Sequence, residues 1–184
     1  MNLLTMPTYE LKAFLTLSKG RCTNTRAALP YAAATMNRLL LVDVDGRRIQ
    51  FTHTNQLWFV RHNTFQLGTV TNGHWCLDMD KLRKLDLSLK HKEVGLDLDG
   101  LRATFVADDY LKGLDFSILT ERNSKGDVAT ASTFDIGLLQ AVTRFFKDAH
   151  CPNVKVIYPE RSFSPIQWDY GAGEYQALLM PIGS

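Results

Sequence analysis

The sequence lacks any apolar run long enough to span a membrane, and it is poor in cysteine. A transmembrane helix needs about 20 consecutive apolar residues, and no stretch approaches that length, so we expect no membrane partner. Residues 1–7 have no basic flank and no long apolar segment, which predicts that they are not a secretory signal. The 3 cysteines are odd in number and far apart, which favours reduced thiols in a cytoplasm over a disulfide framework.

Motifs for catalysis and metal binding are also missing. No G-x-S-x-G, no H-E-x-x-H and no glycine-rich phosphate loop occurs. The D-x-D-G phrases at 43–46 and 97–100 are unlike a calcium loop, because an EF-hand needs its glycine at the sixth position and a glutamate at the twelfth. The H-x-C at 74–76 and the H-C at 150–151 lack the paired spacings of a structural zinc site. We therefore predict no catalytic residue, no metal and no cofactor.

The composition is that of an ordinary globular protein. Its 184 residues are 45% hydrophobic and 22% charged, which is enough for one sizeable core or two small ones. The net charge of +2 neither requires nor excludes a nucleic-acid partner. The positions at which charges cluster therefore matter more than their sum.

The sequence does contain an internal repeat. V-D-V-D-G-R-R-I-Q-F at 42–51 reappears as L-D-L-D-G-L-R-A-T-F at 96–105. Each copy predicts two alternating strands joined at an Asp-Gly turn, because glycine accepts the positive φ of a tight hairpin. A second similarity relates L-D-x-x-K-L-x-x-L at 77–85 to F-D-x-x-L-L-x-x-V at 134–142, with a looser copy at 6–14. In the two close copies, aspartate can cap the helix that follows.

These repeats predict three units, each a strand, a helix and then a hairpin or meander. The alternative is chance similarity between ordinary amphipathic segments. We expect helices at 7–20, 79–87 and 135–149, with Pro152 ending the last of them. We expect a loop at 21–30 and strands near 36–44, 47–54, 57–61, 93–98, 101–106, 115–120, 127–133, 153–158, 165–170 and 174–181. The fold class is α+β, with antiparallel sheets on one side and helices on the other.

Basic residues recur on the polar faces of all three predicted helices. The residues concerned are Lys12, Lys19, Lys81, Arg83, Lys84, Arg144 and Lys147. Such stripes can lie against phosphates and release counterions, which gives salt-dependent binding without sequence preference. The alternative is that these cations simply solvate amphipathic helices.

Several phrases resemble the bacterial DNA polymerase III β subunit, the sliding clamp. F-D-I-G-L-L-Q-A-V at 134–142 resembles the clamp phrase F-[ND]-x-x-[YL]-L-x-x-[AV]. Y-Q-A-L-L-M-P-I at 175–182 is similar to the clamp ending Y-x-x-V-V-M-P-M, and S-P-I at 164–166 to its S-P-[LIV]. Leu29-Pro30 lies where the first clamp domain often has L-P. The similarity is spread over most of the chain, and residues after about 134 carry the most specific part.

The resemblance implies a DNA-clamp-like fold and a non-catalytic function in the cytoplasm, at the nucleoid. Sliding clamps encircle duplex DNA without reading its sequence, and they tether a DNA polymerase or other clamp-binding proteins. The seven cations named above would then face DNA. Clamp partners insert a short apolar peptide into a cleft near the chain end, which makes Met180 and Pro181 candidate cleft residues.

The chain departs from the family in the number of its units. A bacterial clamp subunit has three domains of two units each, whereas this sequence predicts one domain at 1–110 and a half domain at 111–184. An odd number of units leaves an unpaired sheet edge, so we expect a homo-oligomer. Two alternatives stay open: a clamp-fold interaction module or regulator that does not encircle DNA, and a small α+β enzyme without a recognisable motif.

Overall fold

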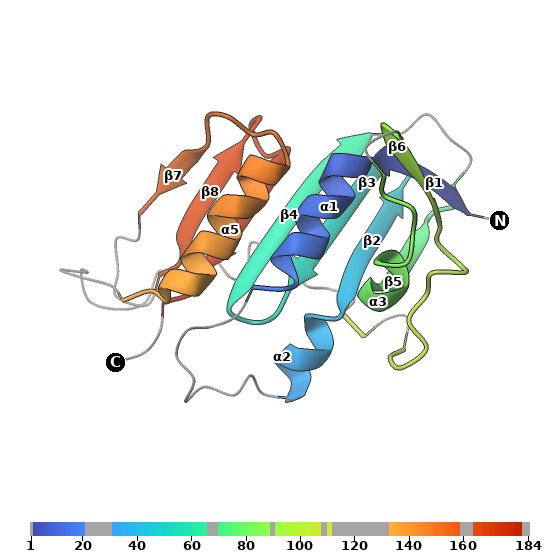
Figure 1. The fold of residues 1–184 in the computed structure, drawn as a ribbon, viewed down its shortest axis with the longest axis horizontal. Coiled ribbons are helices and arrows are strands. Elements are labelled where there is room, and N and C mark those ends of the chain that lie inside the picture. The colour runs from blue at the N-terminus through green and yellow to red at the C-terminus, as the bar shows by residue number, and fades with distance from the viewer. Residues whose placement is uncertain are drawn as a thin grey trace.

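Seven strands form one antiparallel sheet, and helices cover one of its faces (Figure 1). The computed structural model describes residues 2–20, 31–65, 70–88, 91–107, 110–111, 133–158 and 164–181. In chain order its elements are β1 (Leu3–Pro7), α1 (Thr8–Leu17), α2 (Tyr31–Met36), β2 (Leu39–Asp45), β3 (Arg48–Thr54), β4 (Trp58–Phe65), β5 (Gly73–Asp78), α3 (Met79–Leu82), β6 (Glu93–Asp97), α5 (Ile136–Asp148), β7 (Lys155–Ile157), β8 (Ile166–Tyr170) and β9 (Tyr175–Leu179).

The described strands fall into three units. The first unit is β1, α1, β2, β3 and β4; the second is β5, α3 and β6; the third is α5, β7, β8 and β9. The large sheet has the order β5-β2-β3-β4-β9-β8-β7, so the first and third units meet where β4 pairs with β9. The α+β fold with helices on one side of the sheet is therefore as the sequence predicts.

The first two units exchange strands. β1 of the first unit pairs with β6 of the second, and β5 of the second pairs with β2 of the first, both antiparallel. In each unit the strand before the helix thus pairs with the strand after the helix of the other unit. This reciprocity is what a duplicated unit related by a local two-fold axis produces, and it supports the repeat inferred from the sequence.

The second Asp-Gly phrase does not form the predicted hairpin. The first does: β2 and β3 pair around Gly46, whose φ is +59°. After β6, however, the chain turns, and Arg102 forms an isolated antiparallel bridge with Leu77 of β5. Ala103 is buried in a small cluster with Cys76, so local packing against β5 replaces a strand at 101–106.

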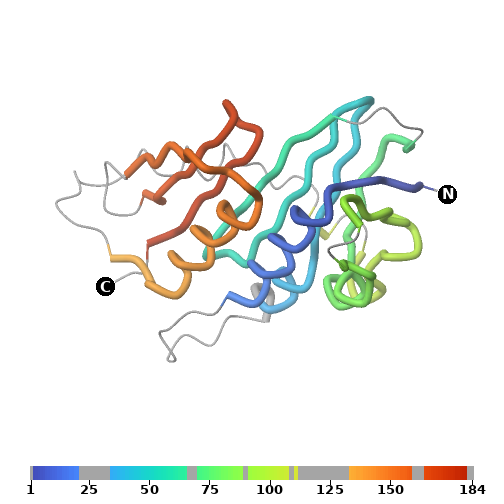
Figure 2. The backbone as a smooth tube through the Cα atoms, turned by 45° about the horizontal axis from the view of Figure 1, so that its top comes forward, coloured from blue at the N-terminus to red at the C-terminus, as the bar shows by residue number. Residues whose placement is uncertain are grey.

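The main core lies between the sheet and the helices. α1 contributes Leu11 and Phe14, both fully buried, and α5 contributes Val142 and Phe145. The rings of Phe14 and Phe145 have centroids 5.0 Å apart, so the two helices pack directly against each other (Figure 2). Met79 of α3 is buried in the same cluster, so all three units share one core.

Helix boundaries differ from prediction in several places. α1 spans Thr8–Leu17 and not 7–20. α3 spans only four residues, because Lys84 and Leu85 donate to carbonyls three residues back and tighten the chain into a turn. α5 ends at Asp148, and His150 takes a left-handed φ of +58° before Pro152 is reached. The helix α2 was not predicted, and the strand expected from residue 36 begins at Leu39.

The last three strands and the helix before them agree with the sequence analysis to within two residues at each end. Asp135 caps α5 by accepting a hydrogen bond from the Leu138 amide at 3.0 Å. Residues 171–173 form the predicted turn, and all three have positive φ. The expected loop at 21–30, the strands at 115–120 and 127–133 and most of the boundary near 110 lie outside the described residues.

Candidate nucleic-acid interface

A stripe of polar side chains runs along α1 on the side away from the sheet. Leu11, Phe14 and Leu17 are fully buried beneath the helix. Because the helix repeats every 3.6 residues, Lys12 lies on the opposite side, and Lys19 continues its line beyond the helix end. The amphipathic sequence thus sets the direction of these cations.

The stripe forms one wall of a groove of about 610 Å³. The other walls are the C-terminal end of α5 and the chain that follows α3. The groove is lined by four cations, one carboxylate, one histidine and four other side chains: Lys12, Lys19, Arg83, Lys147, Asp148, His150, Tyr9, Leu15, Thr16 and Leu87. Four of the residues predicted to face DNA therefore meet in one place, although they come from three separate elements.

Arg83 is held at the groove by hydrogen bonds. Its guanidinium donates to the Ser18 hydroxyl at 2.7 Å and to the carboxylate of Asp80. Asp80 also lies 3.4 Å from the guanidinium of Arg38. The planar fork of arginine suits such multiple bonds, so Arg83 presents a positioned charge rather than a freely moving one.

Three of the predicted cations lie outside the groove. The ammonium of Lys81 donates to the carbonyls of Gly100 and Arg102 at 3.1 and 2.7 Å. Arg144 is exposed and lies 3.4 Å from the carboxylate of Asp148, one turn along α5. Lys84 is exposed beyond the end of α3. Lys81 therefore supports the turn after β6, whereas Arg144 and Lys84 present charge to solvent.

Two further residues line the groove outside the predicted DNA-facing set. Asp148 lies one turn after Arg144 on α5, and His150, considered in the sequence only as part of a histidine–cysteine pair, follows the helix end. The ring of His150 meets the ring of Tyr9 edge to face, with centroids 4.6 Å apart. This contact closes the space between α1 and α5.

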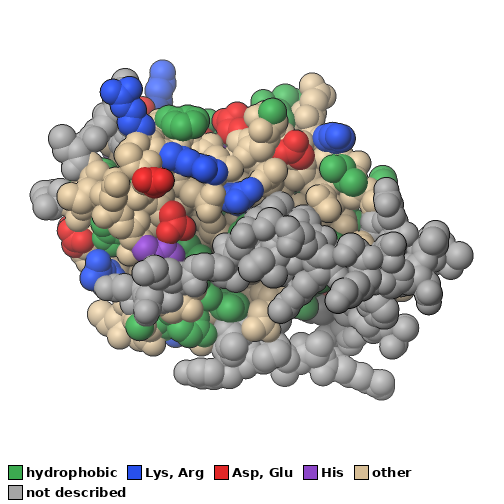
Figure 3. All heavy atoms as spheres, turned by 180° about the vertical axis from the view of Figure 1, so that it is seen from behind, with side chains coloured by type: hydrophobic (Ala, Val, Ile, Leu, Met, Phe, Trp, Pro, Cys, Tyr) green, Lys and Arg blue, Asp and Glu red, His purple; other side chains and the backbone are tan. Residues whose placement is uncertain are grey.

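On the opposite face of the molecule, acidic and basic side chains are interspersed among apolar ones where the described residues are visible (Figure 3). On this side of the sheet Phe59 and Leu178 form a separate buried pair. The four cations of the groove, by contrast, lie together on the helix face.

A small apolar cavity of about 170 Å³ adjoins this pair. Its lining includes Met36, Phe59, Leu178 and Met180. The backbone amide of Met180 donates to the carbonyl of Leu57 at 2.9 Å, which fixes the chain just after β9. Of the two predicted cleft residues, Met180 lines the cavity. Pro181 is partly buried directly after it but is not among the lining residues.

A buried polar cluster joins the first and third units. The carboxylate of Glu10 accepts a hydrogen bond from the Tyr175 hydroxyl at 2.7 Å and a longer one from Tyr9. The His62 ring stacks on Tyr175 with centroids 4.1 Å apart, and its Nδ1 lies 3.3 Å from Glu10. The sequence gives no signal for this cluster, because it forms only when α1, β4 and β9 meet.

Burial controls the protonation of this cluster. It raises the pKa of Glu10 above its ordinary value and lowers the pKa of His62 from 6.5 to about 4. Burial, followed by the Glu10 charge, raises the pKa of the Tyr175 hydroxyl as well. A neutral histidine beside a hydroxyl that stays protonated fits a structural junction between two units.

The histidine–cysteine pairs noted in the sequence serve packing. His74 is hydrogen-bonded to the Asp43 carboxylate, which raises the pKa of His74 to about 9, and its Nε2 lies 4.0 Å from the Cys76 sulfur. Cys76 is fully buried, and burial raises the pKa of Cys151 to about 12. Among the described residues, no group of three or more potential ligands is placed to hold a metal ion, and no helix is long and apolar enough to cross a bilayer.

Comparison with known proteins places this architecture among solved structures. No family model and no curated protein sequence matches the chain. The structure of the DNA polymerase III beta subunit of Thermotoga maritima is similar to this one. The alignment covers 99% of this chain and 65% of the Thermotoga chain, with a TM-score of 0.59 and 10% sequence identity. A DNA polymerase sliding clamp of Pseudomonas aeruginosa aligns with 99% of this chain and 66% of its own, with a TM-score of 0.60 and 12% sequence identity.

The beta subunit of Streptococcus pyogenes DNA polymerase gives a similar result, with a TM-score of 0.55 and 11% identity over 100% of this chain and 66% of that one. The chain thus spans about two thirds of each neighbour's length at most. Since identity is low and coverage of the chain is complete, the similarity lies in the arrangement of helices and strands. The chain has the fold of the DNA polymerase III beta subunit sliding clamps, in a shortened form.

Proposed function

We propose that this protein is a non-catalytic, clamp-like tether that holds DNA-acting proteins on duplex DNA without reading its sequence. The observation that carries the proposal is the groove in which Lys12, Lys19, Arg83 and Lys147 converge on the helix face. Cations on a rigid surface bind phosphates by releasing counterions, and they need no contact with base edges. In this proposal the protein acts at the nucleoid in the cytoplasm, as a homo-oligomer.

The open sheet supports self-association as part of this function. The seven strands of the described residues run from β5 to β7 without closing on themselves, with helices on one side (Figure 2), and an open sheet does not enclose a duplex. Lys84 and Arg144 extend the positive surface beyond the groove in this proposal. Lys81 contributes charge at a distance, because its ammonium is bonded to two backbone carbonyls.

DNA binding is tested by charge reversal in the groove. The change Lys12→Glu with Lys19→Glu places two carboxylates on the wall formed by α1. If all four cations contact phosphates, log K for a short duplex falls with log salt with a slope of about −3 to −4 in the unchanged protein, and the variant loses most of its binding. Fluorescence anisotropy with a labelled duplex measures both quantities.

The matched control is Arg47→Glu with Arg48→Glu. Both residues are exposed at the β2–β3 hairpin and do not line the groove, yet the change in net charge is the same. The proposal expects the hairpin variant to keep most of its affinity. Equal losses in the two variants would show attraction by total charge alone, and they would contradict the assignment of DNA contact to the groove.

The sheet face supports a second part of the proposal, the binding of an apolar peptide from a partner protein. The cavity at Met180 is lined mostly by apolar side chains, with Thr54 and Gln56 as its polar members, and it shares no lining residue with the cationic groove. A labelled synthetic peptide of leucine and phenylalanine is the probe, and Met180→Glu should weaken its binding at least tenfold, or about 1.4 kcal/mol. Ile136→Glu, at an exposed position on α5, is the control.

A protein that binds the peptide but no duplex would be an interaction module of clamp fold rather than a tether. Binding of the duplex without binding of the peptide would support the DNA-binding part of the proposal and contradict the peptide cleft. The two measurements therefore separate the two classes of function. Unchanged peptide binding in Met180→Glu would place the cleft elsewhere.

A further inference from the structure

The groove on the helix face contains more than contact with phosphates requires. Its four cations account for attraction to a nucleic-acid backbone. They do not account for the two leucines and the two rings that line the same space: Leu15, Leu87, Tyr9 and His150. Leu15 is only 7% exposed, and Leu87 packs against the main core. The groove therefore combines charged walls with an apolar floor.

Tyr9 is a positioned ring in this groove. Its hydroxyl donates to the Glu10 carboxylate at 3.4 Å, and its ring meets the ring of His150 edge to face, with centroids 4.6 Å apart. Tyr9 is nevertheless 39% exposed. Because two contacts already restrict this side chain, a planar ligand that stacks on its exposed part costs little further conformational entropy.

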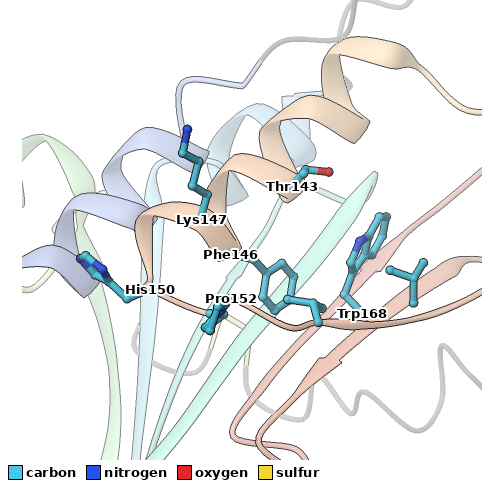
Figure 4. A pocket seen from close by; sticks show the side chains of 9 residues that line it. Thr143, Phe146, Lys147, His150, Pro152 and Trp168 are labelled. Carbon is cyan, nitrogen blue, oxygen red and sulfur yellow. The ribbon is translucent and has the colours of Figure 1, made fainter.

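The end of α5 contributes a cation and the second ring. Lys147 and His150 line both the groove and a second cavity, of about 680 Å³, on the other side of α5. Figure 4 shows Phe146 and Trp168 at that second cavity, whereas Lys147 points away from them. The direction of Lys147 and the contact of His150 with Tyr9 therefore place both side chains at the groove.

The size and the chemistry of the groove suit a nucleotide whose base is unpaired. Its volume of about 610 Å³ is that of a site for a small organic ligand. A duplex keeps its bases stacked inside and offers phosphates and sugars, so it would leave the leucines and Tyr9 unused. An unpaired base has a free π-face that stacks on an aromatic side chain, while its neighbouring phosphates bind cations.

We propose that the groove takes in an unpaired base of single-stranded DNA, which stacks on Tyr9 while the phosphates on either side of it bind Lys12 and Lys147. These two lysines lie on opposite walls of the groove, one on α1 and one on α5. Stacking tolerates every base, so the site needs no sequence preference. This inference rests on the proposed function, because it uses the same groove, and it adds a class of ligand that duplex binding does not require.

Fluorescence anisotropy on the whole chain with three labelled probes is the test. The probes are a strand of about 12 thymidines, a strand of the same length whose backbone carries no bases, and a blunt duplex. At one salt concentration the thymidine strand should bind about fivefold tighter than the abasic strand or better, because the two strands differ only in what can stack. The duplex reports separately on the proposed function.

Variants of Tyr9 assign the preference to its ring. Tyr9→Leu should abolish the preference for the thymidine strand, whereas Tyr9→Phe should keep it, since only the hydroxyl is lost. Tyr110→Leu is the matched control, because Tyr110 is 40% exposed and does not line the groove. Lys12→Glu should weaken the two strands about equally, since it removes attraction to phosphates and not stacking. Circular dichroism checks that each variant is folded.

Equal binding of the thymidine and abasic strands by the unchanged protein overturns the inference, and this comparison depends on no variant. A preference that survives Tyr9→Leu overturns it as well. Free thymidine monophosphate offers one phosphate to four cations, so competition as strong as that of the strand would contradict the assignment to a strand. If the duplex still binds through the groove in these cases, the proposed function stands and only the base site fails. Failure of all three probes to bind removes both.

Discussion

The first and third units present the same arrangement of a helix on three antiparallel strands, but among the described residues only the first has its outer strand covered. In β2, between β3 and β5, Leu40 and Val42 are fully buried. In β7, at the end of the sheet, Val156 and Ile157 are each more than one third exposed. The difference shows that burial of the strand after the helix comes from the neighbouring unit and not from the unit itself.

The sequences of the two strands reflect this difference. β2 begins with an uninterrupted apolar run, L-L-L-V, because both of its faces are covered. β7 has only three residues and begins with lysine. A short strand with a charged residue is typical of a sheet edge that must avoid indiscriminate pairing. The composition of β7 therefore fits a reversible contact rather than a permanent core.

The largest expected effect comes from trimming the same side chain on the two strands. Val42→Ala should lower the free energy of unfolding by about 2–4 kcal/mol, since it removes two buried carbon groups and leaves a cavity. Val156→Ala should cost less than about 0.5 kcal/mol in dilute protein. Urea denaturation measures both. Equal costs at low concentration would contradict the difference in burial, whereas a cost for Val156→Ala that grows with concentration would extend the comparison to a second copy.

The next effect concerns pH, and it should arise in the first unit. His53 is fully buried; its Nδ1 accepts from the Trp58 indole at 3.0 Å, and its Nε2 donates to the Asn37 carbonyl at 3.3 Å. These bonds need a neutral ring, and burial lowers the pKa of His53 to about 4. The unfolded chain binds a proton near 6.5, so stability should fall as the pH drops from 6.5 to 4, by about 2–3 kcal/mol.

Urea denaturation at steps of pH between 7 and 4 tests this slope. His53→Gln should flatten the slope but not abolish it, because His62 acts in the same direction. If stability falls with pH as steeply in His53→Gln as in the unchanged protein, His53 is not the source of the pH dependence.

The smallest effect compares the hairpin turns of the two units. Gly46 has a φ of +59° between β2 and β3, and Ala172 has a φ of +53° between β8 and β9. Left-handed backbone costs an L-residue about 1–2 kcal/mol, which the extra flexibility of glycine in the unfolded chain partly offsets. Ala172→Gly should therefore stabilise the protein by about 0.5 kcal/mol, and Gly46→Ala should destabilise it by about 1 kcal/mol. Thermal unfolding should show a higher melting temperature for Ala172→Gly and a lower one for Gly46→Ala. Changes in the same direction would contradict the turn geometry.

Local signals in the sequence predicted local features well. The aspartate cap of α5, the glycine turn at 171–173 and the Asp45-Gly46 hairpin each depend on a few adjacent residues, and all are present. The same reasoning was wrong for the second Asp-Gly phrase. Residues 101–103 form hydrogen bonds and a bridge with Cys76, Leu77 and Asp78 at β5 in place of the predicted hairpin. Tertiary packing overrode turn chemistry there.

The groove was predictable only in part. Helical spacing identified the cations, but it could not show that Lys12 and Lys147 share a groove while Lys81 bonds to carbonyls. That outcome depends on the packing of α1 against α5, which follows from the pairing of β4 with β9. Residues so distant in sequence carry no periodic signal of their contact. The DNA-facing set and the domain boundary at 110 therefore stay predictions.

The pairing of β4 with β9 also has a consequence for biosynthesis. β4 ends at residue 65, and its partner begins at residue 175, so during translation the edge of β4 remains open until the roughly 110 residues between them and the partner strand itself have left the ribosome. Elongation adds about 5–20 residues per second, which leaves this edge open for several seconds. A nascent chain of this fold would then be a natural client for chaperones that shield strand edges during synthesis.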